Sequence, residues 1–254
     1  MTEIIMHGCN GHMGQVITSI VEKDDEAKIV AGVDITGEKL NDYPVFKNIS
    51  DCNVKADVII DFSAAAALED VLEYSQKNHI PAVLCSTGLS NEQVEKIKAC
   101  SEKVALLKSA NMSLGINMLM NLLKTAVKVL NPEGFDIEIV ERHHNLKKDA
   151  PSGTALALAD AMNEALEKPY SYNYDRSKDN EPRKKEEIGI VALRGGNIVG
   201  EHEVVFAGND EVIEFKHTAT SKAVFAKGAV AAAKFLKNKE SGLFDMADVI
   251  SAAK

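Results

Sequence analysis

Short apolar runs alternate with helical patterns through the first half of this chain. Helix patterns follow these runs over residues 14–21, after Ser63, which is placed to N-cap an alanine-rich helix, and after Ser90, which with Gln93 has the form of a capping box. Runs rich in β-branched residues predict strands over residues 3–7, 28–33, 56–62, 80–85 and 104–107. Strands with so few polar interruptions are typical of a parallel sheet covered on both faces, so the alternation favours a doubly wound α/β domain.

The pattern changes after about residue 114. A helix is predicted over 116–130, a strand over 135–141 and another helix over 154–167, followed by a polar, charged stretch over 170–187 whose last five residues we interpret as solvated loop. Closely spaced strand-like runs with glycine-containing turns then predict an antiparallel meander over residues 188–193, 198–207 and 211–219. These elements indicate a second, α+β domain built on a mainly antiparallel sheet.

The end of the chain, residues 221–238 and 243–253, is helical again, and its periodicity does not decide which domain it packs on. Lys227 and Lys234 interrupt its apolar run, which is too short to span a membrane. No signal peptide precedes the first strand, and the four cysteines lack metal or redox spacing, so we expect a cytoplasmic protein with reduced thiols. A net charge of -9 disfavours nucleic acid and anionic membranes as partners.

Gly8, Gly11 and Gly14 form a Gly-x-x-Gly-x-x-Gly motif between a predicted strand and a predicted helix, and Asp34 ends the next strand. Glycines permit a tight turn close to a pyrophosphate, the helix start supplies N–H donors, and an acid at Asp34 accepts from a ribose hydroxyl. A plain strand-to-helix turn is the simpler interpretation of three glycines alone. The complete context predicts dinucleotide binding.

Small polar loops follow two further predicted strands, at Ser86-Thr87-Gly88 and at Ser109-Ala110-Asn111-Met112. Ligands bind at the carboxyl ends of parallel strands, although turn chemistry alone also places small polar residues there. We interpret His7 and His12 as imidazoles that are solvated or bonded to the backbone.

Cations and a helix start lie together in the segment ERHHNLKKDAPSGT, residues 141–154. Ser152, Gly153 and Thr154 open the predicted helix, and such a start with hydroxyls and unencumbered N–H groups suits a carboxylate or phosphate. Lys147 lies a few residues upstream. Simple capping by Ser152 is compatible with this anion site.

His143 and His144 arrive from the preceding strand. Metal binding by this pair is weakly supported, because neighbours on a strand face opposite ways and no carboxylate or cysteine cluster stands at ligand spacing, so we expect no metal. Proton transfer is the better interpretation, since histidine titrates near neutrality and a desolvated lysine serves as an acid while hydride arrives from a nicotinamide. We expect the strand to end or bulge at this pair, so that both side chains reach one site.

The run from Glu141 to Ala155 resembles the signature of the 4-hydroxy-tetrahydrodipicolinate reductase (dihydrodipicolinate reductase) family of bacterial lysine and diaminopimelate biosynthesis. The likeness covers most of the chain. It extends to the Gly8–Gly14 turn, Asp61-Phe62-Ser63, Ser86-Thr87-Gly88, Ala110-Asn111-Met112-Ser113, Gly200-Glu201-His202 and Ser221-Lys222.

This resemblance implies a Rossmann-type domain over residues 1–114 plus 222–254, a substrate domain over 115–221, and a homotetramer assembled through the sheet of the substrate domain. It also implies a reaction. NADH or NADPH would reduce a cyclic imine with two carboxylates, 4-hydroxy-tetrahydrodipicolinate, to tetrahydrodipicolinate, with loss of water, hydride transfer and protonation.

The resemblance assigns roles by position. His143 matches the catalytic histidine and Lys147 the proton-donating lysine, while His144 and the turn of Ser152, Gly153 and Thr154 match substrate-binding positions. The positions that match cofactor-binding residues are Gly8, Cys9, Asn10, Gly11, His12, Met13, Asp34, Cys85, Ser86, Thr87, Ser109, Ala110, Asn111 and Met112.

Two departures from the commoner family pattern bear on the cofactor. Cys85-Ser86 stands where many members have Gly-Thr, and Ile35 instead of an arginine follows the ribose-binding acid. Asp34 accepts from the 2′-hydroxyl of NADH but repels a 2′-phosphate, so NADH should be at least as good as NADPH. Lys39 is close enough in sequence to bind such a phosphate.

Two other functions stay open at this point. One is a Rossmann reductase acting on a different small anion, such as an amino-acid or oxoacid substrate. The other is a regulator that senses the nicotinamide cofactor, but such a protein normally carries a DNA-binding module, and this chain has no basic helix-turn-helix pattern.

Overall fold

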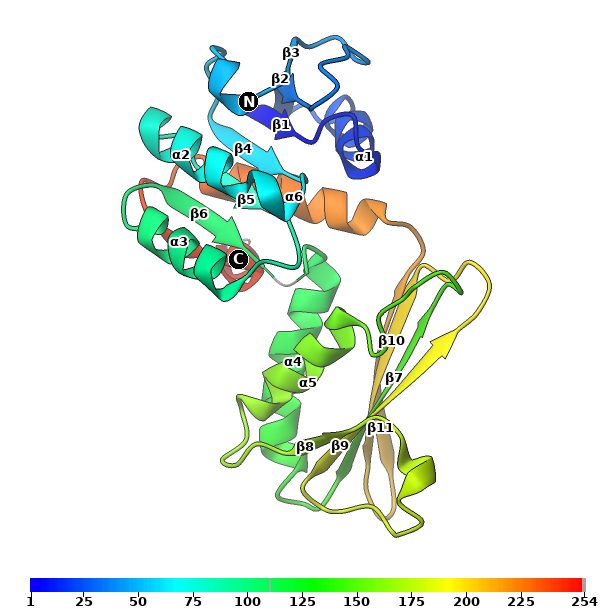
Figure 1. Ribbon diagram of the computed structural model, residues 1–254. Helices are drawn as coiled ribbons and strands as arrows, with labels where there is room; N and C mark the ends of the chain where they lie inside the picture. Colours follow the sequence, from blue (N-terminus) through cyan, green and yellow to red (C-terminus); the bar gives the residue numbers. More distant parts are fainter. Residues whose placement is uncertain (110, 253–254) are drawn as a thin grey trace. The chain divides into compact units, whose positions relative to one another are not determined.

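The structure is a computed structural model that describes residues 1–109 and 111–252 (Figure 1). The chain divides into two compact units. The first unit comprises Met1–Leu114 and Ala223–Lys254, and the second comprises Gly115–Lys222. The end of the chain therefore folds with the first unit. Its helical periodicity alone did not show which unit it packs on. Within the described ranges, no helix is long and apolar enough to cross a membrane.

A seven-stranded sheet forms the centre of the first unit, and each pair of neighbouring strands is parallel. The doubly wound α/β prediction is confirmed. In the order β12-β6-β5-β4-β1-β2-β3, the strands are Gly242–Phe244, Ala105–Lys108, Ala82–Leu84, Val58–Asp61, Thr2–His7, Ala27–Val33 and Val45–Phe46. The sequence patterns missed β3 and β12, because strands of two and three residues are too short to show a periodicity.

Helices cover both faces of this sheet. Alternate side chains of β1 point to opposite faces, so Ile4 lies in one core with α1, α6 and α7, while Ile5 lies in the other with α2 and α3. The helices are α1 (His12–Val21), α2 (Leu68–Asn78), α3 (Asn91–Ser101), α6 (Ala223–Leu236) and α7 (Met246–Ala252), with short 3₁₀ turns η1 (Ile49–Asp51) and η2 (Ala65–Ala67).

The two predicted helix caps have different outcomes. Ser90 caps α3 through a complete capping box with Gln93, as predicted. Ser63 does not cap α2, which begins only at Leu68, after η2. The Ser63 hydroxyl donates instead to Asp61 Oδ1 at 2.6 Å, because the buried carboxylate at the end of β4 is the stronger acceptor.

The second unit contains a five-stranded mixed sheet with helices packed on one face, where α4 and α5 contribute to a single core with the strands (Figure 1). The strand order is β11-β10-β7-β9-β8. The elements are α4 (Leu114–Leu130), β7 (Asp136–His143), α5 (Gly153–Asn163), β8 (Ser171–Asn173), η3 (Arg176–Lys178), β9 (Glu187–Arg194), β10 (Gly200–Ala207) and β11 (Val212–Ala219).

The predicted three-stranded meander is wrong in one pairing. β10 and β11 form an antiparallel hairpin as expected, but β9 pairs with β7 and β8 in parallel, and β7 lies between β9 and β10. The Gly195-Gly196 connection passes over the end of β7, where Gly195 N donates to His143 O and Asn145 N donates to Gly196 O. The glycine pair therefore belongs to a connection that crosses the end of β7, and not to a tight hairpin turn.

The charged stretch over residues 170–187 is more ordered than a solvated loop. It contains β8 and η3, and Arg176 donates to Glu138 at 3.0 Å. Arg183 pairs with Asp136 and donates to the carbonyl of Glu187, which is buried at the start of β9. The interpretation of residues 183–187 as solvated loop is confirmed for the exposed Lys184, Lys185 and Glu186, but it is wrong for Arg183, which is half-buried and ion-paired, and for Glu187, which begins β9.

Candidate functional site

The glycine motif forms the turn between β1 and α1. Gly8 has a φ of +79°, a conformation that L side chains rarely adopt, and Gly11 N donates to Gly8 O at 3.1 Å. A Cβ on Gly14 would lie 2.3 Å from Gly8 O, so only glycine lets α1 pack this closely on the turn. The backbone of this turn therefore has the shape that a pyrophosphate needs to approach.

Hydrogen bonds join the turn to the end of β2. Gly8 N and Cys9 N both donate to Val33 O, at 2.8 and 3.2 Å, and Asn10 N donates to Asp34 Oδ2 at 3.3 Å. The helix begins at His12, so the N–H groups of its first turn, at residues 12–14, point out of the helix without an intrahelical acceptor. These N–H groups and the helix dipole favour an anion such as a phosphate.

Asp34 directly follows β2, and its carboxylate is held in place. Asp34 Oδ1 accepts from Thr36 N at 3.1 Å and from Thr36 Oγ1 at 2.9 Å, while Asn10 Nδ2 donates to Thr36 Oγ1 at 3.0 Å. The adjacent Ile35 side chain is 90% exposed. A fixed carboxylate beside the glycine turn is suited to accept from a ribose hydroxyl.

The remaining side chains of this motif differ in what they offer a ligand. Cys9 is fully buried in the core, and burial, followed by the charge of Asp34, raises the pKa of its thiol to about 11. Met13 packs against the same core, whereas His12 is exposed, as expected for a solvated imidazole. Contacts from Cys9 to a ligand are therefore limited to its backbone.

Polar groups also gather where β5 ends. Ser86 is buried, and within the described ranges its Oγ has no hydrogen-bond partner, while Thr87 is exposed. Burial raises the pKa of the neighbouring Cys85 thiol, with the charge of Asp61 acting in the same direction. A buried hydroxyl without a partner fits a site at which a bound group completes the hydrogen bonding.

The loop after β6 is held by its own hydrogen bonds. Ser109 Oγ donates to the carbonyl of Asn111 at 3.0 Å, and Asn111 Oδ1 accepts from Ser113 N at 2.8 Å. Met112 is buried in the core, and Ala110 lies outside the described residues. The glycine turn, Asp34 and the ends of β5 and β6 all belong to the carboxyl edge of one parallel sheet, so the first unit fits a nicotinamide dinucleotide.

The interpretation of His7 as a solvated or backbone-bonded imidazole is wrong. His7 Nδ1 lies 2.7 Å from Asp61 Oδ1, and Asp61 is fully buried. The two residues are register partners at the ends of β1 and β4. A histidine that ends a buried strand needs a polar partner, and the acid that ends the adjacent strand supplies it.

In the second unit, the predicted cationic segment is built around Glu141, which is fully buried. Arg194 binds the carboxylate in a bidentate manner, from Nη1 to Oε2 at 2.8 Å and from Nη2 to Oε1 at 2.7 Å. His143 Nδ1 lies 2.6 Å from Oε2, and Ser152 N donates to Oε1 at 2.9 Å. One carboxylate thus joins a strand end, a neighbouring strand and the start of α5.

The charge states of this cluster follow from burial and hydrogen bonding. Burial acts to raise the pKa of Glu141, but hydrogen bonds from Arg194, His143 and Ser152 outweigh it, and the pKa is lowered. Burial lowers the pKa of His143, and the Glu141 carboxylate offsets only part of this effect. At neutral pH, Glu141 is therefore a carboxylate and His143 a neutral imidazole that donates through Nδ1.

The strand ends at the histidine pair, as predicted. His143 is the last residue of β7 and is buried, while the half-buried His144 follows outside the ladder. The loop then places Lys147 Nζ 2.9 Å from Asp149 Oδ2, and the Lys147 side chain is 22% exposed. Lys148 is exposed.

The start of α5 combines a cap with open space. Ser152 is the N-cap, and its Oγ accepts from Ala155 N at 3.2 Å. A Cβ built on Gly153 would meet nothing within 4 Å, so there is open space beside the first residue of α5, whose backbone N–H bonds to the carboxylate of Asp149. Capping by Ser152 is confirmed, and anion binding at the same turn stays a prediction.

His202 belongs to the same cluster, although from the sequence it was named only within the family-like run Gly200-Glu201-His202 and given no role. It is buried, its Nε2 lies 2.9 Å from Ser152 Oγ, and its ring packs edge-on against His143 with centroids 5.1 Å apart. Burial, and then the charge of His143, lowers the pKa of His202 to about 3. Glu141 and Arg194 were missed in the same way, and a glutamate two residues before His143 in a buried strand was the available signal.

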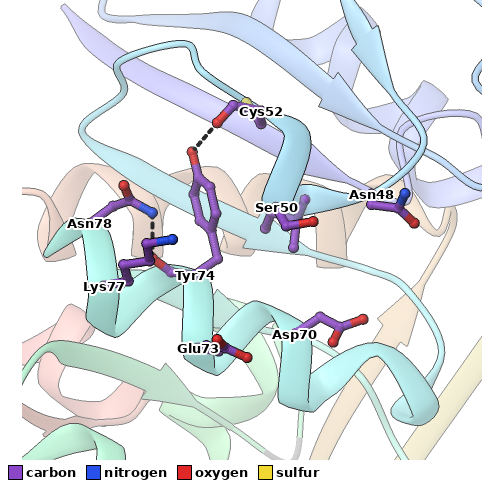
Figure 2. A pocket seen from close by; sticks show the side chains of 9 residues that line it. Asn48, Ser50, Cys52, Asp70, Glu73, Tyr74, Lys77 and Asn78 are labelled. Atoms are coloured by element: carbon purple, nitrogen blue, oxygen red, sulfur yellow. Dashed lines mark hydrogen bonds between the residues drawn. The ribbon is translucent and has the colours of Figure 1, made fainter.

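A separate hollow of about 230 Å³ lies in the first unit between η1 and α2 (Figure 2). Tyr74 OH donates to the carbonyl of Cys52 at 3.0 Å, and burial raises the pKa of Tyr74 to about 12. None of the predicted site residues lines this hollow. The candidate site is therefore the two clusters described above.

Comparison with known proteins identifies the family of both parts of the chain. The model of the dihydrodipicolinate reductase N-terminus matches residues 2–112, and that of the dihydrodipicolinate reductase C-terminus matches residues 115–250. The C-terminal model thus includes α6 and α7, which fold with the first unit. The chain is 49% identical to the 4-hydroxy-tetrahydrodipicolinate reductase of Caldanaerobacter subterraneus subsp. tengcongensis, with 98% of each chain covered. It is 48% identical to that of Clostridium novyi, with 99% of each covered.

A solved structure shares the fold. The dipicolinate-bound dihydrodipicolinate reductase of Paenisporosarcina sp. TG-14 aligns with a TM-score of 0.81 and 22% identity, covering 96% of this chain and 97% of that one. Both family models together span nearly the whole sequence, and the identity to full-length relatives approaches one half. This chain therefore belongs to the dihydrodipicolinate reductase family.

Proposed function

We propose that this chain is an oxidoreductase that reduces 4-hydroxy-tetrahydrodipicolinate to tetrahydrodipicolinate with NADH or NADPH, a step of lysine and diaminopimelate biosynthesis. The observation that carries the proposal is the buried Glu141–His143 contact of 2.6 Å beside an open helix start at Gly153, in a chain that also has a dinucleotide-type glycine turn. The names of the curated relatives support the same substrate.

The first unit, Met1–Leu114 and Ala223–Lys254, holds the cofactor in this proposal, so Lys222 belongs to the second unit and not to the predicted cofactor domain. The N–H groups at the start of α1 bind the pyrophosphate, and Asp34 accepts from a ribose hydroxyl. The buried Ser86 hydroxyl and the loop over residues 109–112 contact the rest of the cofactor. When bound, the nicotinamide supplies the hydride.

The second unit, Gly115–Lys222, holds the substrate. A cyclic imine with two carboxylates needs cations and a site that favours an anion, and the turn at Ser152, Gly153 and Thr154 lies beside open space at the positive end of the α5 dipole. Lys147 and His144 lie on the loop just before this turn and supply positive charge or further hydrogen bonds. The dipicolinate bound to the related reductase of Paenisporosarcina is a dicarboxylate of the same kind.

His143 and Lys147 carry out the proton transfers. Neutral His143 donates through Nδ1 to Glu141, which leaves Nε2 with a lone pair to accept a proton. The Lys147 ammonium is a donor. His143 can accept a proton and Lys147 can donate one. Such a base and acid suit a reaction that loses water and then adds a proton as hydride reaches the ring.

NADH serves at least as well as NADPH in this proposal. Asp34 is a fixed carboxylate where a 2′-phosphate would lie, and exposed Ile35 brings no positive charge to offset the repulsion.

The assembly we propose is a cytoplasmic homotetramer built through the second sheet. Val191 and Leu193 on β9 are 55% and 45% exposed, which gives that sheet apolar side chains for a partner subunit to cover. All four cysteines are free thiols, in keeping with a reducing compartment. Light scattering on the purified protein would measure the assembly, and a monomeric mass would contradict it.

Turnover tests the proposed activity. The purified chain is mixed with NADH and with 4-hydroxy-tetrahydrodipicolinate generated in place, and the loss of NADH absorbance is followed. Oxidation of NADH that requires this substrate supports the proposal. Oxidation only with another amino-acid or oxoacid substrate would favour a different Rossmann reductase, and cofactor binding without any turnover would favour a sensor of the cofactor.

A further inference from the structure

The carboxylate of Glu141 connects two parts of the second unit that serve different purposes in the proposed reaction. Oε2 contacts the Nδ1 of His143 at 2.6 Å, and Oε1 accepts from the backbone N of Ser152 at 2.9 Å. The carboxylate is fully buried, so water does not compete for these contacts. The proton-transfer histidine and the anion-binding turn thus share one anchor.

Arg194 fixes that anchor from the neighbouring strand β9. Its two terminal nitrogens bind the two oxygens of Glu141 at 2.8 and 2.7 Å, which sets the plane of the carboxylate. Nη2 also donates to the carbonyl of Asp149 at 2.6 Å. The guanidinium therefore holds both the carboxylate and the loop that leads into α5.

The contacts of Glu141 dictate the tautomer of His143. An ionised carboxylate only accepts, so the proton of a neutral His143 lies on Nδ1 and the lone pair on Nε2. Nε2 faces Gly200, where an added Cβ would come within 3.0 Å of it. The reacting nitrogen thus keeps a fixed direction, and it lies close to Gly200, where a side chain would crowd it.

We propose that Glu141, held by Arg194, is a positioning residue that sets the tautomer of His143 and the start of α5 together. The inference rests on the proposed function, because it takes His143 as the reacting group and the turn at Gly153 as the substrate site. Changes at Glu141 should therefore alter both kcat and KM. Changes that keep the carboxylate but disturb the start of α5 should alter mainly KM.

The groups that face His143 determine how its titration responds. They are Glu141 on its own strand, Arg194 on β9, Lys147 on the following loop and His202 on β10. Glu141 is the one negative charge in this set, and His202 is neutral at neutral pH. Glu141→Gln therefore lowers the pKa of His143 further and moves the acidic limb of the pH–rate profile to lower pH.

The experiment compares Glu141→Gln and Arg194→Lys with the wild type and a control. Glu141→Gln should lower kcat by about 10²- to 10⁴-fold and raise KM, because its amide N–H₂ must face either His143 Nδ1 or Ser152 N. Arg194→Lys keeps the charge but loses the bidentate contact. It should raise KM by roughly 10- to 100-fold, the scale of a lost charge-assisted hydrogen bond, and leave the acidic limb in place.

Glu203→Gln is the matched control. Glu203 on β10 accepts from Arg142 Nη1 on β7 at 2.9 Å, and Arg142 alternates with Glu141 and His143 along β7, so this ion pair lies on the opposite face of the sheet. The control should keep kcat, KM and the acidic limb within about twofold of the wild type, the small effect typical of a partly exposed pair.

Nitrogen-15 NMR of the imidazoles provides a test that does not depend on turnover. The wild type should show His143 protonated at Nδ1, and Glu141→Gln should move the proton to Nε2. An Nε2–H tautomer in the wild type would overturn the inference, as would an acidic limb that Glu141→Gln and Glu203→Gln leave equally unmoved. If Glu141→Gln does not fold, two measurements still test the positioning role of Glu141. They are the tautomer of His143 in the wild type and the KM of Arg194→Lys. Wild-type protein without turnover would contradict the proposed function, while the tautomer would still decide the positioning role.

Discussion

Ser152 Oγ lies 2.9 Å from His202 Nε2, although the two residues are 50 positions apart in the chain. The same oxygen accepts from Ala155 N at 3.2 Å and so caps α5. A hydroxyl has one proton and two acceptor lone pairs, so the Ser152 side chain holds both contacts at once. A single hydroxyl therefore joins the start of α5 to β10.

Ser152→Ala should destabilise the second unit more than an ordinary lost cap does. It removes the cap of α5, worth about 1 kcal/mol, and leaves His202 Nε2 buried without a partner, which costs about 1 to 3 kcal/mol more. The free energy of unfolding, measured by urea denaturation, should fall by about 2 to 4 kcal/mol. The KM for the dicarboxylate substrate should rise, because the helix start loses its fixed geometry.

Ser90→Ala in the first unit is the control for this prediction. Ser90 Oγ accepts from Gln93 N at 3.2 Å as the cap of α3, and it is exposed. This change should cost about 1 kcal/mol and leave KM unchanged. Equal losses from the two variants would show that the contact with His202 contributes nothing.

The free energy of unfolding should decrease as the pH falls below 6.5. The pKa of His202 is about 3 in the folded protein, so between about pH 6.5 and 3 the unfolded chain binds a proton that the folded chain does not. Unfolding then takes up protons, and stability rises with pH by up to about 1.4 kcal/mol per pH unit for each such histidine. Burial lowers the pKa of His143 and His217 as well, which adds to the slope.

Urea denaturation at several pH values between 7 and 4.5 would measure this slope. The lowered pKa of Glu141 acts in the same direction at lower pH, because its carboxylate stabilises the fold above its unfolded pKa and that stabilisation is lost as the pH falls through its folded pKa. His202→Gln should remove the contribution of one histidine. A free energy of unfolding that stays constant from pH 7 to 4.5 would show that these histidines are accessible to protons in the folded state.

The sequence predicted the first unit well, because its strands and helices alternate and the centres of its longer strands are apolar. The pairing of the second sheet was not predicted. Whether β9 pairs with β10 or with β7 depends on where the connection at Gly195 passes, and here it crosses the end of β7. Local patterns fix the existence of a strand, whereas its neighbour depends on contacts between distant segments.

The same limit applies to the site. His143, Lys147 and the turn at Gly153 lie within one short segment, so their types and spacing were sufficient to propose proton transfer next to an anion site. The groups that orient them are dispersed, with Arg194 on β9 and His202 on β10. A buried arginine or histidine has no sequence pattern of its own until the fold supplies its partner.

Cofactor choice should depend on Asp34 and Ile35. The wild type should have a kcat/KM with NADH at least equal to that with NADPH. Ile35→Arg should raise the value for NADPH, because a guanidinium beside the ribose offsets the repulsion of a 2′-phosphate. Ile35 is 90% exposed, so this change should leave stability nearly unaffected. Initial rates with each cofactor provide the measurement.

If the wild type uses NADPH well, Lys39→Ala shows whether Lys39 binds the 2′-phosphate or whether Asp34 lies outside the ribose pocket. Lys39 is exposed a few residues beyond Asp34 and is the alternative phosphate-binding residue. If Lys39→Ala abolishes NADPH use, that lysine binds the phosphate. A large wild-type preference for NADPH that Lys39→Ala leaves intact would mean that Asp34 does not line the ribose pocket.

Gly153→Val should weaken substrate binding without unfolding the protein. The added Cβ meets nothing within 4 Å, so the fold accommodates it, but it enters the open space beside the start of α5 where the substrate carboxylate is proposed to bind. KM for the dicarboxylate should rise while kcat changes little, as expected when binding common to the ground state and the transition state is lost. Calorimetric titration with pyridine-2,6-dicarboxylate should show the same loss of affinity, and unchanged affinity would place the substrate elsewhere.

Lys147→Ala should separate chemistry from cofactor binding. Lys147 is proposed to donate the proton in the transition state, so kcat should fall by roughly 10²- to 10⁴-fold, the usual scale for a lost acid or base. NADH affinity, measured by fluorescence titration, should barely change, because the glycine turn belongs to the other unit. Lys148→Ala is the control, since Lys148 is exposed and its loss should have little effect. If Lys148→Ala is as damaging as Lys147→Ala, the assignment of residues along this loop is wrong, and if neither variant loses activity, the proposed proton transfer from this segment is wrong.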